Sequence, residues 1–464
     1  MRRGAAAALL VALAATGCTA GSPPDPAADP GPTTTTPAPS QTTPEPPRSH
    51  PVVLAVHATT RVPPVTLRDA RRILRGAASR WRVVAAPGMP VGSAVEVLGS
   101  AGAVRRAVER DAQILGVLPA RAAGPTVRAL TVGRADPFAD PRRYPLTTDG
   151  LRPPRPTTVT VVGDLMLTRG VTDPAGALRP MASRLRGADL TVGNLENTLS
   201  RAGPPQQGGD SFGADPEVVR LLVRAGFDAV SLANNHVGDF GEQALLDTVR
   251  RLEQSPVEPF GAGRGLREAM RPAVLARHGV SFAFLGFNAI GETPAAAPGT
   301  PGALTVRMPP RTGPLSVDDL SRVTDQVGRL ARRVDVVVVL PHWGTQYTHV
   351  PEPVQRLVGR RLVDAGADLV VGGHPHWVQG LDVHRGRVIA HSLGNFVFDM
   401  DFMTETQQGV VLEATYWGDR LKALDLVPYR MDPSFAPRPA APEEAADILA
   451  DVWSTSTGPF SRPG

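Results

Sequence analysis

The chain has 464 residues, of which 42% are hydrophobic and 20% are charged. These fractions are those of an ordinary globular protein, and they exclude a chain that is disordered throughout. The formal net charge of +5 falls to +3 without Arg2 and Arg3, and the other arginines are scattered among acidic residues, which argues against nucleic-acid binding.

The first 18 residues have the residue pattern of an export signal. Two arginines are followed by a stretch of about a dozen apolar residues and then by small residues. The stretch is too short to cross a bilayer as a helix. It resembles a bacterial lipoprotein signal peptide, which implies lipidation of Cys18 and anchoring at the extracytoplasmic face of the cell membrane. The alternative is an ordinary secretory signal with an incidental cysteine.

Two segments separate this signal from the main domain. Residues 19–48 are rich in Pro and Thr and have few large apolar side chains, so we expect a disordered tether. Residues 50–150 alternate strand and helix patterns and predict a small α/β module. This module resembles part of a phosphate-type solute-binding protein but has room for about one lobe, so a degenerate accessory domain is the alternative.

Strands and helices alternate regularly over residues 157–432. The segment TTVTVVGD predicts a buried strand and EVVRLLVRAG a helix, while PAVLARHGVSFAFLGFN predicts a hairpin that turns at His278 and Gly279. Alternation indicates parallel strands, and the hairpins add antiparallel ones. We therefore expect a layered α/β domain, followed by a C-terminal tail over 433–464.

Short polar motifs follow the apolar runs of this domain: VVGDLML, TVGNLEN, SLANNHVGD, VVVLPHWG, VVGGHPHW and HSLGNFVFD. Open α/β sheets build their sites at the carboxyl ends of strands, where these motifs fall. Carboxylate, carboxamide and imidazole together suit a divalent metal ion. Alternatively, Asp164 caps the next helix, and Asn235 with His236 holds a turn.

Taken in order, these motifs resemble the CapA family of bacterial capsule synthesis proteins, which is associated with poly-γ-glutamate. The resemblance rests on GDLML with Arg169, NLE, SLANNHVGDFG, HWG, LVDAGADLVVGGHPHWVQG and SLGNFVFD. It implies a four-layer αββα sandwich of the calcineurin-like metallophosphoesterase type, with the motif loops gathered on one edge.

The resemblance also implies one or two divalent ions of Mn, Zn, Fe or Mg. Carried over by motif, Asp164 and His376 would hold the first ion and Glu196 would bridge. The ligands of the second ion would be Asn235, His342 and His374. His236 would protonate the leaving group, with Asp239 as the other catalytic residue, and the site loops would also contribute Asn194, Arg169 and Asn395. The family of phosphoesterases has His where this chain has Met166, which leaves a mononuclear site open.

Two functions follow from these features. The first is a metal-dependent hydrolase or transferase that acts on a phosphoester, amide or related bond of a cell-envelope polymer. The second is a non-catalytic accessory subunit of a membrane capsule-synthesis complex, which would bind an anionic polymer through arginines such as Arg169, Arg201 and Arg360.

Overall fold

The computed structural model describes residues 49–77 and 80–462. The expected signal peptide, Cys18 and the Pro/Thr-rich tether lie outside the described residues. Within the described residues, no helix has both the length and the apolar character needed to cross a membrane.

The N-terminal module is built on a mixed six-stranded sheet. Its strand order is β3-β2-β4-β1-β5, and β6 pairs with β1. The strands are β1 (Ser49–His57), β2 (Arg82–Ala85), β3 (Glu96–Val97), β4 (Ile114–Pro119), β5 (Val127–Ala129) and β6 (Thr147–Asp149). Helices α1 (Leu67–Leu74) and α2 (Ala101–Arg110) begin where Thr66 and Ser100 accept hydrogen bonds from backbone N–H groups of the first turn.

An eight-stranded sheet forms the first half of the main domain. Its order is β10-β9-β8-β7-β20-β21-β22, and β19 also pairs with β7. Strands β7 to β10 run parallel, whereas β20 joins β7 in the antiparallel sense. The bounds are β7 (Pro156–Leu165), β8 (Leu190–Leu195), β9 (Ala229–Ser231), β10 (Glu258–Phe260), β19 (Asn395–Val397), β20 (Gln408–Trp417), β21 (Arg420–Met431) and β22 (Pro437–Pro439).

A six-stranded sheet in the order β12-β13-β15-β16-β18-β17 forms the second half. Its strands are β12 (Ala273–Arg277), β13 (Val280–Asn288), β15 (Val336–His342), β16 (Leu369–Val371), β17 (Leu381–His384) and β18 (Arg387–Ala390). The predicted hairpin at His278 and Gly279 is confirmed, because β12 and β13 pair in the antiparallel sense across it. A small ladder joins β11 (Ala262–Gly263) to β14 (Gly302–Ala303).

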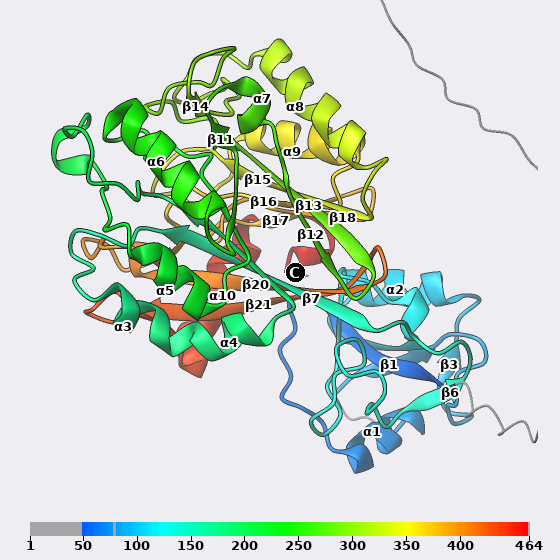
Figure 1. Cartoon of the computed structure of the whole chain (residues 1–464). Coiled ribbons are helices and arrows are strands. Elements are labelled where there is room, and N and C mark those ends of the chain that lie inside the picture. Colours follow the sequence, from blue (N-terminus) through cyan, green and yellow to red (C-terminus); the bar gives the residue numbers. More distant parts are fainter. Residues whose placement is uncertain (1–48, 78–79, 463–464) are drawn as a thin grey trace, which may run out of the picture. The chain divides into compact units, whose positions relative to one another are not determined.

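The two large sheets share one hydrophobic core. Val159 and Val161 of β7 pack in the same cluster as Phe282 and Phe284 of β13. The outer face of the first sheet packs against α3 (Pro174–Leu178), α4 (Ala182–Gly187), α5 (Val218–Ala225) and α6 (Gly241–Glu253). The outer face of the second packs against α8 (Val317–Leu330) and α9 (Pro353–Ala365), near the short α7 (Leu266–Ala269) (Figure 1). The domain is therefore mixed α/β, with helices outside two packed sheets.

The segment expected to be a C-terminal tail contains helix α10 (Pro442–Thr455). Ile448, Val452 and Trp453 of this helix are buried in the core between the sheets. Beyond the helix, the Ser456 hydroxyl accepts a hydrogen bond from the N–H of Leu381 at 2.8 Å. These contacts place residues 442–456 within the packed structure of the domain.

Candidate metal centre

The carboxyl ends of the parallel strands deliver the polar motifs to one place. In the first sheet, Asp164 of β7 lies beside Asn194 of β8. In the second sheet, Asn288 of β13 pairs with His342 of β15, and a further bridge joins His342 to Gly373. The two sets meet, because Nδ2 of Asn194 lies 3.2 Å from Nδ1 of His342.

Asp164 connects three of the motif loops. Its Oδ1 accepts a hydrogen bond from Asn194 at 2.8 Å, and its Oδ2 accepts one from the backbone N–H of His374 at 3.0 Å. A Cβ on Gly373 would lie 2.5 Å from Oδ1, so only glycine allows this close approach. Asp164 does not cap the next helix, since Asp173 occupies the N-cap of α3. The fully buried carboxylate therefore belongs to the site.

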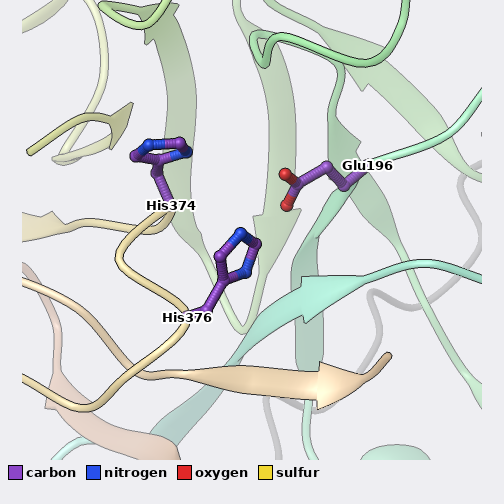
Figure 2. A group of neighbouring side chains, drawn as sticks. All are labelled: Glu196, His374 and His376. Carbon is purple, nitrogen blue, oxygen red and sulfur yellow. The ribbon is translucent and has the colours of Figure 1, made fainter. Parts of the chain in front are cut away.

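Glu196 is the residue common to two candidate ligand groups. One group consists of Glu196, His374 and His376, and the other of Asp164, Glu196 and His342, with the donor atoms of each within 4.8 Å of one another. Figure 2 shows the side chains of the first group converging, with the two histidines on one loop and Glu196 opposite them. Burial, reinforced by the charge of Asp164, raises the pKa of Glu196 to about 8.

The three histidines are buried and lie in different hydrogen-bond environments. His376 Nδ1 lies 2.8 Å from Oδ1 of Asn395, and His342 Nε2 lies 2.9 Å from Oδ1 of Asn235. His374 has no hydrogen-bond partner at either ring nitrogen within the described part of the chain. Burial lowers the pKa of all three, to about 4 for His342, so each imidazole is neutral and can offer a lone pair at pH 7.

The backbone at the two loop histidines is strained. His374 has a φ of +94° and His376 a φ of +60°, in the left-handed region that residues other than glycine rarely adopt. Strain of this kind costs on the order of 1–3 kcal/mol per residue and persists where the surroundings enforce it, often at functional sites. The sequence pattern HPH gave no indication of these conformations.

These residues fit a divalent cation. Three of their buried polar atoms have no hydrogen-bond partner among the described residues: Oε1 of Glu196 and the two ring nitrogens of His374. Buried polar atoms are normally hydrogen-bonded. Oxygen and imidazole donors suit Mn, Fe, Zn or Mg. The two groups share Glu196, as a bridging ligand would. Asp164 lies near His342 in one group, and its Oδ2 also lies 3.9 Å from Nδ1 of His376, the residue expected to share its ion.

Met166 follows Asp164 by two residues and has an apolar environment. Its side chain is fully buried in the cluster formed by the first sheet and its covering helices. The position where the resemblance to phosphoesterases implies a histidine is therefore filled by an apolar side chain that contributes packing.

His236 lies beside the ligand groups and is paired with Asp239. Its Nδ1 is 2.8 Å from Oδ2 of Asp239, and its Nε2 is 4.0 Å from Oε1 of Glu196. Burial disfavours the protonated imidazole, but the hydrogen bond that Nδ1 donates to Asp239 and the nearby carboxylates outweigh it and raise the pKa of His236. For Asp239, burial raises the pKa of the carboxyl group, and the hydrogen bond and charge of His236 oppose this effect.

Phe212 is a site residue that the motif analysis missed. Its ring stacks on the imidazole of His236, with centroids 3.9 Å apart, and the Arg169 guanidinium lies 4.6 Å from the same centroid. Since the imidazole occupies one face of the ring, the guanidinium must lie over the other. Arg169 is held there by two hydrogen bonds to Asp399. Phe212 is a single aromatic residue in a polar, glycine-rich loop, and this isolated position was the feature of the sequence that could have indicated a role in the site.

Glu292 was also missed; it lies in the loop after β13, four positions beyond Asn288. Its Oε2 accepts a hydrogen bond from Nδ2 of Asn235 at 2.7 Å. The other two expected polymer-binding arginines are both exposed: Arg201 pairs with Asp215, and Arg360 lies on α9.

Comparison with known proteins gives the family of the chain. Residues 158–400, which include all the candidate ligands, match the model of the bacterial capsule synthesis protein family PGA_cap. The chain belongs to this family. The resemblance to the CapA family seen in the motifs is thereby confirmed.

Three proteins similar to this chain are named for capsule or polymer synthesis. The chain is 31% identical to the capsule biosynthesis protein CapA of Bacillus anthracis, over 61% of this chain and 69% of the relative. It is 32% identical to the PGA biosynthesis protein CapA of Bacillus subtilis, over 54% of this chain and 66% of the relative. A probable polyglutamine synthesis accessory protein of Mycobacterium tuberculosis is 30% identical, over 46% of this chain and 56% of the relative.

Proposed function

We propose that this PGA_cap family protein acts in the synthesis or export of an anionic cell-envelope polymer of the poly-γ-glutamate type, as a metal-dependent hydrolase. The observation that carries the proposal is the pair of buried ligand groups that share Glu196. The arrangement of helices outside two packed sheets supports an αββα sandwich of the calcineurin-like type.

The ligands of the proposed centre would be Asp164, Glu196, Asn235, His342, His374 and His376. A bound divalent ion supplies Lewis acidity and lowers the pKa of a water molecule. Asp164 and the backbone N–H of His374 hold the loops together, and Asn395 orients the ring of His376 through Nδ1.

His236 would serve as general acid. Its Nδ1 faces Asp239, so Nε2 is the position from which a proton can be given to a leaving group. The hydrogen bond to Asp239 and the neighbouring carboxylates raise the pKa of His236 and so favour the proton-carrying ring, and the stacked Phe212 fixes the plane of the ring. The bond attacked would be a phosphoester, amide or related linkage of the polymer.

We further propose that the protein is exported and anchored through Cys18. The basis is the residue pattern of positions 1–18. Mass spectrometry of the protein extracted from membranes tests this, since a diacylglyceryl group on Cys18 is expected and an unmodified cysteine contradicts it.

A non-catalytic polymer-binding subunit is the second candidate. It is favoured by the position of Met166 in the apolar core, which leaves the first motif with Asp164 as its only ligand. In that role the ion would bind carboxylates of the polymer instead of activating water.

Metal analysis of the full chain tests the proposed centre. The parent protein should bind one or two ions after loading with Mn, Zn, Fe or Mg, and a His374→Ala/His376→Ala variant should lose them. A matched control is His384→Ala, because His384 lies on β17 and pairs with Asp364 instead. Absence of metal from the parent would refute the centre. Metal binding without turnover of phosphoester or polyglutamyl substrates would favour the second candidate.

A further inference from the structure

The side-chain amide of Asn235 has two chemically different ends, and only one can bind a cation. Its Oδ1 lies 2.9 Å from Nε2 of His342, within the ligand cluster. Its Nδ2 points to Glu292 and donates a hydrogen bond to Oε2 at 2.7 Å. An amide that rotated by half a turn would present its NH₂ group to the cluster and could not serve as a ligand.

Glu292 is a group that selects one of these two orientations. An ionised carboxylate only accepts hydrogen bonds, so it must meet the NH₂ end of the amide and turn the oxygen the other way. Its second oxygen, Oε1, accepts from Nη2 of Arg311 at 2.5 Å. The ion pair holds the carboxylate in place while both side chains remain partly exposed.

The loop that carries Glu292 is shaped to present it. Gly291 and Glu292 have φ values of +91° and +64°, a left-handed pair that is unusual for a glutamate. Asn288 stabilises this turn by donating to the carbonyl of Gly291 and accepting from the N–H of Ile290, both at 2.9 Å.

The next residue of the same loop contacts the motif that contains Asn235. The hydroxyl of Thr293 accepts a hydrogen bond from the N–H of Gly238 at 3.0 Å. The loop and the NNHVGD motif are therefore fixed to each other at two points, through Glu292 and through Thr293. Backbone strain maintained by such contacts is typical of functional sites.

We propose that Glu292, held by Arg311, is a positioning residue of the metal centre that fixes the Asn235 amide with its oxygen directed to the cation. The inference rests on the proposed function, because it assigns a role toward the ion bound by Asn235 and His342. Glu292 lies outside the polar motifs of the sequence, between SLANNHVGD and VVVLPHWG.

The consequence is a specific loss of metal affinity. Removal of a group that orients a ligand typically weakens metal binding about 10- to 100-fold. The loss should affect the ion at Asn235 and His342, and an ion at His374 and His376 should be retained, because Glu292 makes no hydrogen bond to either residue among the described contacts.

The test compares two variants of the full chain. Glu292→Gly removes the carboxylate at a φ that glycine adopts readily, so the backbone should keep its shape. Glu292→Gln has only one acceptor oxygen, so it is combined with Arg311→Ala, which removes the guanidinium that would compete for it; the oxygen can then accept from Nδ2 of Asn235 and most of the affinity should be retained. Metal affinity and stoichiometry are measured by calorimetry and elemental analysis with Mn²⁺, and the thermal midpoint of the metal-free proteins serves as the folding control.

Electron paramagnetic resonance provides a readout that does not depend on activity. If the parent binds two Mn²⁺ ions with coupled spins, Glu292→Gly should show the spectrum of an isolated ion. If the parent binds one ion, the affinity of Glu292→Gly should fall about 10- to 100-fold.

Each outcome has one meaning. Unchanged stoichiometry and affinity in Glu292→Gly would overturn the role of Glu292 and leave the metal centre intact. Equal losses in Glu292→Gly and in the Glu292→Gln/Arg311→Ala variant would also overturn it, because the acceptor oxygen would then be irrelevant. A parent that binds no metal would refute both the proposed function and this inference.

Discussion

Glu196→Gln isolates the energetic effect of one buried carboxyl group. Burial and the charge of Asp164 raise the pKa of Glu196 from 4.5 to about 8, and its Oε1 has no hydrogen-bond partner among the described residues. A carboxyl group with a raised pKa binds its proton more tightly in the folded state. The free energy of unfolding of the metal-free protein should therefore fall as the pH rises from about 4.5 to about 8.

The magnitude follows from the size of the shift. One pKa unit corresponds to about 1.4 kcal/mol, so the destabilisation above pH 8 is at most about 5 kcal/mol. Glutamine has nearly the same shape but no charge. The variant should accordingly be the more stable protein in the metal-free form, with an advantage that is absent at low pH and grows until the pH reaches about 8.

With bound metal, the parent should be more stable than Glu196→Gln, the reverse of the order expected for the metal-free proteins. A cation held by the ionised Glu196 stabilises the folded parent by about 2.7 kcal/mol at a concentration one hundred times the dissociation constant. Glutamine is a weaker ligand, so the variant should gain much less.

The assay is urea-induced unfolding at pH 5, 7 and 9, first with a chelator and then with Mn²⁺. Glu242→Gln, which changes an exposed glutamate in the first turn of α6, is the matched control. Parallel stability curves for the parent and Glu196→Gln across this pH range would refute the reasoning, because they would mean that the carboxyl group is not held in its protonated form by the fold.

Three further substitutions have defined outcomes. Asp239→Asn removes the partner that raises the pKa of His236. An NMR titration of His236 should therefore show a lower pKa, and the alkaline limb of the pH profile of any activity should move to lower pH. An unchanged titration of His236 would contradict the pairing. Gly373→Ala puts a Cβ 2.5 Å from Oδ1 of Asp164. Its free energy of unfolding, measured in urea, should be lower by about 1–3 kcal/mol, and its metal affinity should also fall. Met166→His places an imidazole in an apolar core and should destabilise the protein by about 1–3 kcal/mol, without an additional metal ion in elemental analysis. A gain in bound metal would show that position 166 faces the centre.

The local pattern of the sequence was sufficient for much of the architecture. Apolar runs predicted the buried strands, because a strand covered on both faces needs apolar residues along its whole length. The turn at His278 and Gly279 predicted the hairpin. The polar motifs at strand ends predicted which residues would gather, because the carboxyl ends of parallel strands share one edge of a sheet.

The C-terminal helix was not recognised as part of the core. The sequence pattern predicts a tail over 433–464, whereas Ile448, Val452 and Trp453 of α10 pack between the sheets. Which partner an amphipathic helix finds depends on the surface that distant strands leave uncovered, and the helical segment alone does not contain that information.

What the sequence determined by itself was the family and the set of chemical groups, since both depend on residue identities and their order along the chain. The tertiary structure decided how the groups associate: that Glu196 belongs to two ligand groups, that Met166 turns into the apolar core, and that Phe212 and Glu292 support the site. The physical reason is that these contacts join residues far apart in sequence. Asn235 and Glu292 are 57 positions apart, and no local pattern of charge or hydrophobicity encodes the orientation of one amide against one carboxylate.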